Sequence, residues 1–141
     1  MTKPGPGFVP VLAMTVTASG STTPTDVVLK RAEKQLHVAY DDGQSFDLPA
    51  EFLRVNSPSA EVQGHGPSQR KLVSGAQHVG LMSLEAVGNY AVRLIFDDLH
   101  DSGIYSWSFL RAIGEHQEVL WQSYLYELEQ RGLSRDPKVR T

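Results

Sequence analysis

Short segments with apolar residues at alternate positions follow one another from residue 26 onward. Leu36, Val38 and Tyr40 alternate with His37 and Ala39, which predicts a half-buried strand. Similar β-prone segments predict further strands at 27–29, 44–48, 79–87, 90–96 and 104–105. Asp-Asp-Gly at 41–43 and Gly-Asn at 88–89 predict tight turns, because these residues tolerate the φ angles that hairpins need. The pattern therefore indicates antiparallel hairpins.

Three segments favour helices. Pro49 suits the first position of a short helix that runs to Arg54, and Ser106 can cap a second short helix. A longer amphipathic helix is predicted over 115–131, with Gly132 as its stop signal. Its apolar residues fall on one stripe at helical spacing: Trp121, Tyr124, Leu125 and Leu128.

One of these patterns occurs twice. The segment 36–54 (LHVAYDDGQSFDLPAEFLR) is echoed by 92–111 (VRLIFDDLHDSGIYSWSFLR). Each copy predicts a strand, an acidic turn, a returning strand and a short helix. Two such units can cover each other's apolar sheet faces. We therefore expect an α+β fold in which two related units form small antiparallel sheets, closed by the C-terminal amphipathic helix.

The two ends of the chain differ from the middle. Residues 1–25 contain a single charged side chain, Lys3, among several Pro and Gly, so they predict a flexible tail. The alternative is a signal peptide with Phe8–Val16 as its apolar part, but this part is short and interrupted by Pro10. We expect one domain over 26–132 and a basic C-terminal tail over 133–141.

Composition narrows the function classes. The 141 residues carry a net charge of −3, contain no cysteine and have no apolar stretch long enough to span a membrane. Disulfides, thiolate metal sites and cysteine nucleophiles are excluded. The acidic balance argues against nucleic acid as the main partner. These features predict a soluble, cytoplasmic protein without a membrane or nucleic-acid partner.

Catalytic motifs are missing from the sequence. It holds neither a Gly-x-Ser-x-Gly elbow nor a Walker loop, and 64–66 (GHG) does not continue into a dinucleotide loop because Gln69 replaces the third glycine. The single His-x-Glu, 116–118, lies on a predicted helix, where residues two apart point about 200° from each other. It cannot form the iron triad of a dioxygenase, so the sequence favours a non-catalytic domain over an enzyme.

Histidine and aspartate at the second acidic turn are candidate metal ligands. His100 lies among three aspartates, and a site formed by His100, His65 and Asp98 could hold a divalent iron, manganese or zinc ion. The commoner alternative is a hairpin tip whose aspartates bind their own backbone and whose histidine is solvated.

The long predicted loop over 55–77 is a second candidate site. Its glycine N–H groups and two cations could receive a phosphate or the carboxylates of a partner: Gly64, Gly66, Ser68, Arg70 and Lys71. The alternative is a solvated loop with scattered charge.

A protein-contact surface is also predicted. Tyr126 lies off the apolar stripe of the last helix, near Arg131 and Arg135, and aromatic and arginine side chains are common at interfaces. The predicted first strand, with Val27–Arg31, could pair with a partner chain or a second copy through its edge.

Three stretches resemble one known family: LRVNSPSAEVQGHG (53–66), VGNYAVRLIFDDLHDSGIYSWSFLR (87–111) and LWQSYLYELEQRGLSRD (120–136). They are similar to the gamma-butyrobetaine hydroxylase-like N-terminal domain, over roughly residues 26–136. The resemblance implies a small non-catalytic α+β domain. Such domains precede the catalytic jelly roll of carnitine-pathway 2-oxoglutarate dioxygenases, follow some iron–sulfur-carrier ATPases, or stand alone in many bacteria.

The hydroxylase members hold a structural zinc through three cysteines and one histidine. Ser57, Ser59 and Val62 stand at the cysteine positions here, and His100 at the histidine position. A tetrahedral zinc needs four donors, so we expect no structural zinc and no other cofactor. The preferred function is an accessory or protein-interaction domain, linked to iron or iron–sulfur metabolism by the resemblance alone. The alternative is a small metal-binding protein or metal-dependent enzyme centred on His100 and His65.

Overall fold

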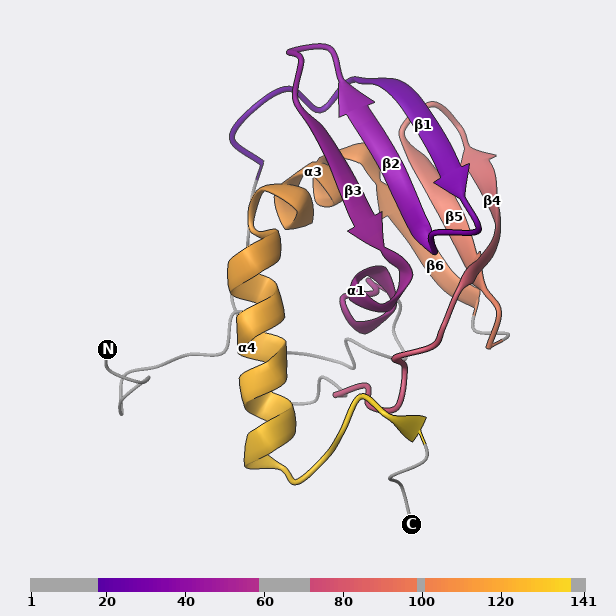
Figure 1. Ribbon diagram of the computed structural model, residues 1–141. Helices are drawn as coiled ribbons and strands as arrows, with labels where there is room; N and C mark the ends of the chain where they lie inside the picture. The colour runs from indigo at the N-terminus through magenta and orange to yellow at the C-terminus, as the bar shows by residue number, and fades with distance from the viewer. Residues whose placement is uncertain (1–17, 59–71, 99–100, 138–141) are drawn as a thin grey trace.

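The computed structural model describes residues 18–58, 72–98 and 101–137. Within these ranges the chain forms two three-stranded antiparallel sheets and their helices (Figure 1). The first unit contains β1 (Pro24–Lys30), β2 (Gln35–Tyr40), β3 (Ser45–Pro49) and α1 (Ala50–Val55). The second contains β4 (Leu81–Val87), β5 (Ala91–Phe96), β6 (Asp101–Ser106) and α3 (Trp107–Glu115), and α4 (Gln117–Gln130) follows it.

The predicted α+β fold with two small antiparallel sheets and a C-terminal helix is confirmed. Several boundaries differ from the prediction, most clearly those of β1 and α4. Strand β1 begins at Pro24, two residues before the expected start of the patterned region. The predicted helix over 115–131 begins only at Gln117, because His116 leaves helical geometry and separates α3 from α4. Among the described residues, no helix is long and apolar enough to cross a membrane.

The structural repeat extends further than the sequence repeat, because it includes the first strand of each unit. In both first strands the register shifts at the same place: between Pro24 and Asp26 in β1, and between Leu81 and Ser83 in β4. The strand order is also the same, with β2 and β5 at the centre of their sheets. Each unit is therefore a three-stranded meander followed by a helix.

The start of each acidic turn is bound in the same way. The Asp41 N–H donates to Thr23 O at 3.0 Å, and the Asp97 N–H donates to Gly80 O at 2.9 Å. In the second unit the Asp97 side chain also accepts a hydrogen bond from the Gly80 N–H at 2.9 Å. These bonds attach each turn to the residue that precedes its own first strand.

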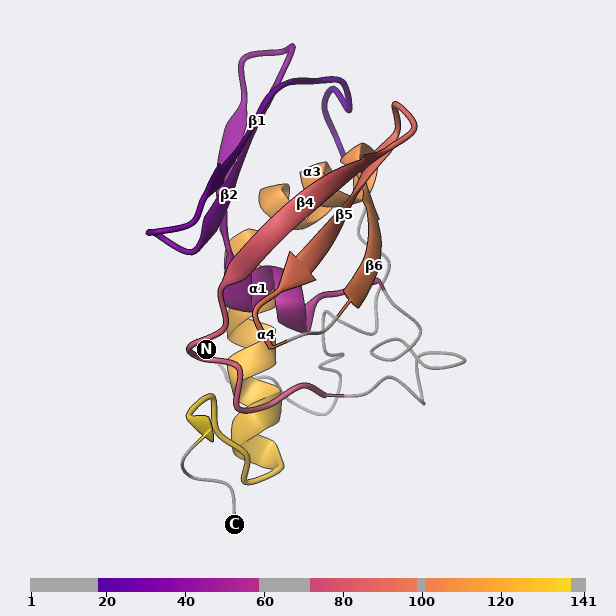
Figure 2. The same cartoon turned by 90° about the vertical axis from the view of Figure 1, so that its right-hand side faces the viewer.

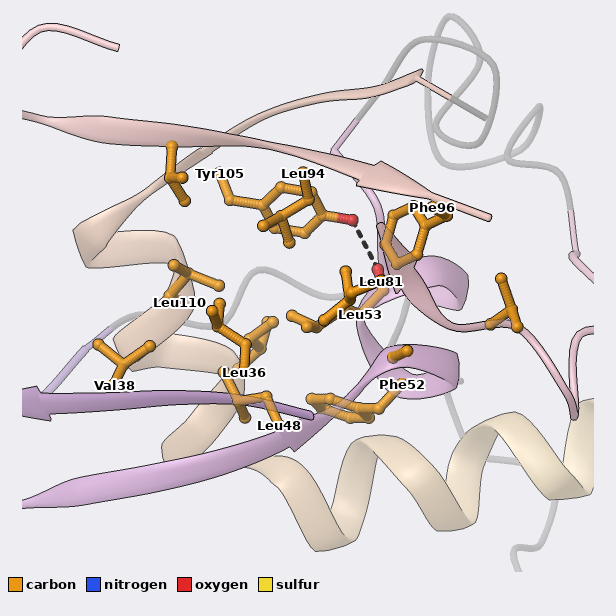
Figure 3. Packing of buried hydrophobic residues seen from close by; sticks show 14 of the residues in the cluster. Leu36, Val38, Leu48, Phe52, Leu53, Leu81, Leu94, Phe96, Tyr105 and Leu110 are labelled. Atoms are coloured by element: carbon orange, nitrogen blue, oxygen red, sulfur yellow. Dashed lines mark hydrogen bonds between the residues drawn. The ribbon is translucent and has the colours of Figure 1, made fainter. Parts of the chain in front are cut away.

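The main core lies between the two sheets, which Figure 2 shows as separate layers. Apolar side chains of both sheets face this space, and α1 and α3 add leucines to it (Figure 3). The leucines of the two helices, Leu53 and Leu110, are both fully buried. The strand residues around them are Leu36, Val38, Leu48, Leu94, Phe96 and Tyr105.

Two buried tyrosines bind the helix of the opposite unit. Tyr105 Oη of β6 donates to Leu53 O of α1 at 2.7 Å, and Tyr40 Oη of β2 donates to Trp107 O of α3 at 2.9 Å. Burial raises the pKa of Tyr40, so its hydroxyl stays protonated as a donor. Both bonds cross between the units and hold each helix against the sheet of the opposite unit.

The end of α4 has a Schellman motif. Gly132 takes a φ of +66°, which glycine adopts without strain. The Leu133 N–H donates to Leu128 O at 2.9 Å, and the Gly132 N–H donates to Glu129 O at 3.2 Å. The predicted stop signal is thus found at the expected residue, and it turns the chain back toward the domain.

Candidate functional site

Two arginine–aspartate pairs join the repeat units crosswise. Arg111 Nη1 of α3 lies 3.0 Å from Asp42 Oδ1, in the acidic turn of the first unit. Arg54 Nε of α1 lies 3.1 Å from Asp98 Oδ2, in the acidic turn of the second unit. The two arginines occupy equivalent positions in the repeat, as do the two aspartates, so each helix binds the turn of the other unit.

Arg111 is the centre of a cluster of charged and aromatic side chains. Its side chain is buried, its Nε donates to Glu115, and its guanidinium lies over the rings of Tyr40 and Phe46 at 5.2 and 5.5 Å. The hydrogen bond from Arg111 lowers the pKa of Asp42 to about 2. The same arginine is the largest cause of the lowered pKa of Glu115. The cluster therefore keeps both carboxylates charged.

Residues 18–21 lie against this cluster. The Ser19 N–H donates to Glu115 Oε1 at 2.8 Å, and the Ser21 N–H donates to Asp42 Oδ2 at 3.3 Å. A Cβ atom on Gly20 would collide with the arginine guanidinium between them. The segment before β1 is thus bound through its backbone, and a side chain at position 20 would force the Arg111 guanidinium to move.

Acidification is expected to destabilise the protein through the Arg111 cluster. A carboxylate with a lowered pKa stabilises the folded state above its ordinary pKa, and this stabilisation is lost as the pH falls through the lowered value. Because the pKa of Asp42 is about 2, we expect the Tm to fall between pH about 4 and about 2. Thermal unfolding followed by circular dichroism at several pH values measures this change.

Two aspartate-to-asparagine variants test this prediction, one in the cluster and one exposed. In the cluster, Asp42→Asn should lower the Tm at neutral pH and reduce the further fall of the Tm below pH about 4. Asp26→Asn, on the exposed part of β1, should follow the wild type. Equal pH slopes in the wild type and Asp42→Asn would contradict the role given to this carboxylate.

A pocket of about 300 Å³ lies between the starts of α1 and α4 and the segment after α4. Apolar and aromatic side chains supply much of its wall, and charged groups lie beside them. The lining residues are Pro49, Glu51, Phe52, Gln117, Glu118, Trp121 and Arg135.

A bidentate ion pair forms one side of the pocket. Arg135 Nε and Nη2 donate to the two carboxylate oxygens of Glu51 at 2.9 and 2.8 Å. The Arg135 guanidinium also lies 5.2 Å over the Trp121 ring, and this ring is 6.5 Å from that of Phe52. The Gln77 N–H donates to Arg135 O at 3.0 Å, which fixes the backbone of the segment after α4. The pocket is therefore pre-organised by contacts between distant parts of the chain.

The predicted contact residues have different environments. Arg135 contributes to the pocket, where its guanidinium is bound to Glu51. Arg131 is exposed just after α4, and Tyr126 is half-buried on that helix. The helical spacing assigned Trp121 to the apolar core stripe and did not predict that it lines the pocket. The Glu51–Arg135 pair spans 84 residues, so no local pattern could indicate it.

The expected edge strand β1 is at the edge of its sheet. Its neighbour in space is β4: Arg31, after the end of β1, donates from Nε to Met82 O at 2.9 Å. Val28 on β1 is 40% exposed. Pairing of this edge with another chain stays a prediction.

Most of the predicted metal and anion ligands lie outside the described residues: His65, His100, Gly64, Gly66, Ser68, Arg70 and Lys71. Asp98 is described, and its carboxylate binds Arg54. Of the positions that carry zinc cysteines in the hydroxylases, Ser57 is described and fully buried, whereas Ser59 and Val62 are not described. Over 18–58, 72–98 and 101–137, no three histidine, aspartate or glutamate residues are arranged to hold a metal ion.

Several solved structures are similar to this chain. One NMR solution structure is 44% identical, with a TM-score of 0.71, and the match covers 90% of this chain and 98% of the other. A second NMR solution structure is 45% identical, also with a TM-score of 0.71, and the match covers 84% and 89% of the two chains. No curated protein matches.

A crystal structure from Acidithiobacillus ferrooxidans is also similar. It is of a protein with unknown function that belongs to the DUF971 family, and it is 33% identical with a TM-score of 0.54. The match covers 64% of this chain and 90% of the other. In addition, the family model described as gamma-butyrobetaine hydroxylase-like, N-terminal, matches residues 27–111. This chain therefore belongs to the gamma-butyrobetaine hydroxylase-like N-terminal domain family.

Proposed function

We propose that this domain is a non-catalytic interaction module that binds a partner protein through the pocket between α1 and α4. The observation that carries the proposal is the pocket itself, where Trp121 and Arg135 lie together beside Phe52. Tryptophan and arginine are the residue types that contribute most often to interface hot spots, especially where they line a pocket. A partner's apolar side chain fits such a wall.

Charge favours a basic partner segment. Helix α4 carries Glu118, Glu127 and Glu129 and contains no lysine or arginine over 117–130. Glu118 lines the pocket, while the charge of Glu51 is paired with Arg135. A partner segment with an apolar anchor flanked by lysine or arginine would match this surface.

Site-specific photo-crosslinking in cells tests the proposal. A photoreactive residue at position 122 lies beside the pocket, since Gln122 Nε2 donates to Glu118 Oε2 at 3.1 Å. We expect it to form a discrete adduct with a partner protein, whereas the same residue at the exposed position 25 on β1 should form none. Mass spectrometry of the adduct should identify a crosslinked peptide with basic residues beside an apolar anchor.

A charge reversal supplies the matched control. Glu118→Lys should reduce the adduct yield by about fivefold, since a rim charge contributes up to about 1 kcal/mol. Glu85→Lys makes the same change at an exposed position of β4, in the second sheet and outside the pocket lining, and should leave the yield unchanged. Equal adducts from positions 122 and 25, or equal losses in both charge variants, would overturn the proposal.

A further inference from the structure

The two crosswise arginines differ in how completely they are bonded. Arg111 uses two edges of its guanidinium: Nη1 binds Asp42, and Nε binds Glu115. Arg54 uses one edge, with Nε bound to Asp98 at 3.1 Å. Its Nη1 is buried and has no hydrogen-bond partner within the described parts of the chain. Within the described residues, Arg111 thus binds two carboxylates, whereas Arg54 binds one and leaves its Nη1 without an acceptor.

Helix length explains the difference. Helix α3 continues to Glu115, one turn after Arg111, so it supplies a second carboxylate to its own arginine. Helix α1 ends at Val55, and the residue at the position equivalent to Glu115 is Pro58, which has no acceptor in its side chain. Helix α1 therefore supplies no second carboxylate to Arg54.

A buried guanidinium nitrogen without an acceptor is unfavourable, because it has lost water and gained no bond. The Arg111 cluster demonstrates that one arginine in this fold accommodates two carboxylates. The side chain of Arg54 is 11% exposed, and that of its partner Asp98 is 41% exposed. Because Nη1 itself is buried, an acceptor from outside the chain has to displace the groups that cover this atom.

We propose that Arg54 is a binding site for a carboxylate that comes from outside the chain. The ligand would accept a charge-assisted hydrogen bond from Nη1, in the role that Glu115 has at Arg111. A singly charged carboxylate fits better than a phosphate dianion, because Asp98 already lies on the same guanidinium and repels further negative charge. Neither Arg54 nor Asp98 lines the pocket between α1 and α4, so this site can be tested separately.

The test is an NMR titration of the full ¹⁵N-labelled chain with sodium acetate, against sodium chloride at equal ionic strength. We expect acetate to move the Nε–Hε signal of Arg54 in a saturable way and to leave that of Arg111 unchanged. Arg54→Lys should weaken acetate binding about tenfold or more, followed on the amide signal of Leu53, because lysine lacks a second donor edge. Asp98→Asn should strengthen binding, because it removes the neighbouring negative charge.

Arg93→Lys, on the same sheet as the second acidic turn, is the matched control and should leave acetate binding unchanged. A parallel titration with a glutamate-containing peptide distinguishes a protein carboxylate from a small-molecule carboxylate. The probe that saturates the Arg54 signal at the lower concentration resembles the natural ligand more closely. Two results would overturn the proposal: no saturable shift with either probe, and an equal shift with inorganic phosphate.

Discussion

Replacing Leu53 or Leu110 by alanine is expected to lower the free energy of unfolding by about 2–5 kcal/mol in each variant. Both side chains are fully buried, and each extends from a helix into the core between the two sheets (Figure 3). Alanine would leave a cavity that the surrounding strands cannot fill. Because the two leucines are equivalent in the repeat, we expect losses of similar size. Urea unfolding followed by tryptophan fluorescence measures both.

Val119→Ala is the control for the leucine variants. Val119 is 47% exposed on α4, so its truncation should change the free energy of unfolding by less than about 0.5 kcal/mol. A large loss in one leucine variant and a small loss in the other would show that the two helices do not contribute equally to one core. That result would contradict the structural equivalence of the units.

Most of the fold could be predicted because its signals are local. The first acidic turn illustrates this: Asp41 and Asp42 precede Gly43, which takes a φ of +88° between β2 and β3. Alternating apolar residues then determine which face of each strand points into the core. The repeat of turn and helix residues also indicated two related units correctly, and the family assignment agrees with the matched residues 27–111.

The equivalence of β1 and β4 could not be predicted, because it is a property of backbone pairing. Their sequences, PTDVVLK and LMSLEAV, share no residue at equivalent positions, yet both strands shift register after their first residue. Similarly, the break at His116 follows from a change of backbone angles within an otherwise helical pattern.

The candidate sites were only partly predictable, for reasons of distance along the chain. The sequence revealed both acidic turns and both Leu-Arg pairs, but not that Arg111 binds Asp42 across 69 residues and Arg54 binds Asp98 across 44. Such pairing depends on how the two units are oriented. The spacing of residues within either unit carries no information about this orientation. For the same reason, the sequence could not show which residues line the pocket. The predicted metal site at His100 and His65 stays a prediction.

Gly114→Ala is expected to destabilise the protein by about 1–3 kcal/mol, although alanine usually stabilises a helix interior by about 1 kcal/mol relative to glycine. Gly114 is buried in α3 and faces Phe46 of β3. An added Cβ would lie 2.8 Å from Phe46 Cγ and 3.3 Å from its Cβ. Because these atoms are at the base of the side chain, rotation of the ring cannot relieve the collision. Overpacking should therefore outweigh helix propensity, and the loss is measured by urea unfolding.

The same substitution in a Phe46→Ala background separates the two effects. Without the ring, the added methyl group meets no obstacle at Cγ, so Gly114→Ala should then become neutral or stabilising by up to about 1 kcal/mol. The Phe46→Ala variant alone is the reference, since it also removes the ring beneath Arg111. If Gly114→Ala stabilised the protein with Phe46 present, close packing of α3 against β3 would be contradicted. A change of sign between the two backgrounds would instead show that contact with the first sheet requires glycine at this position of α3.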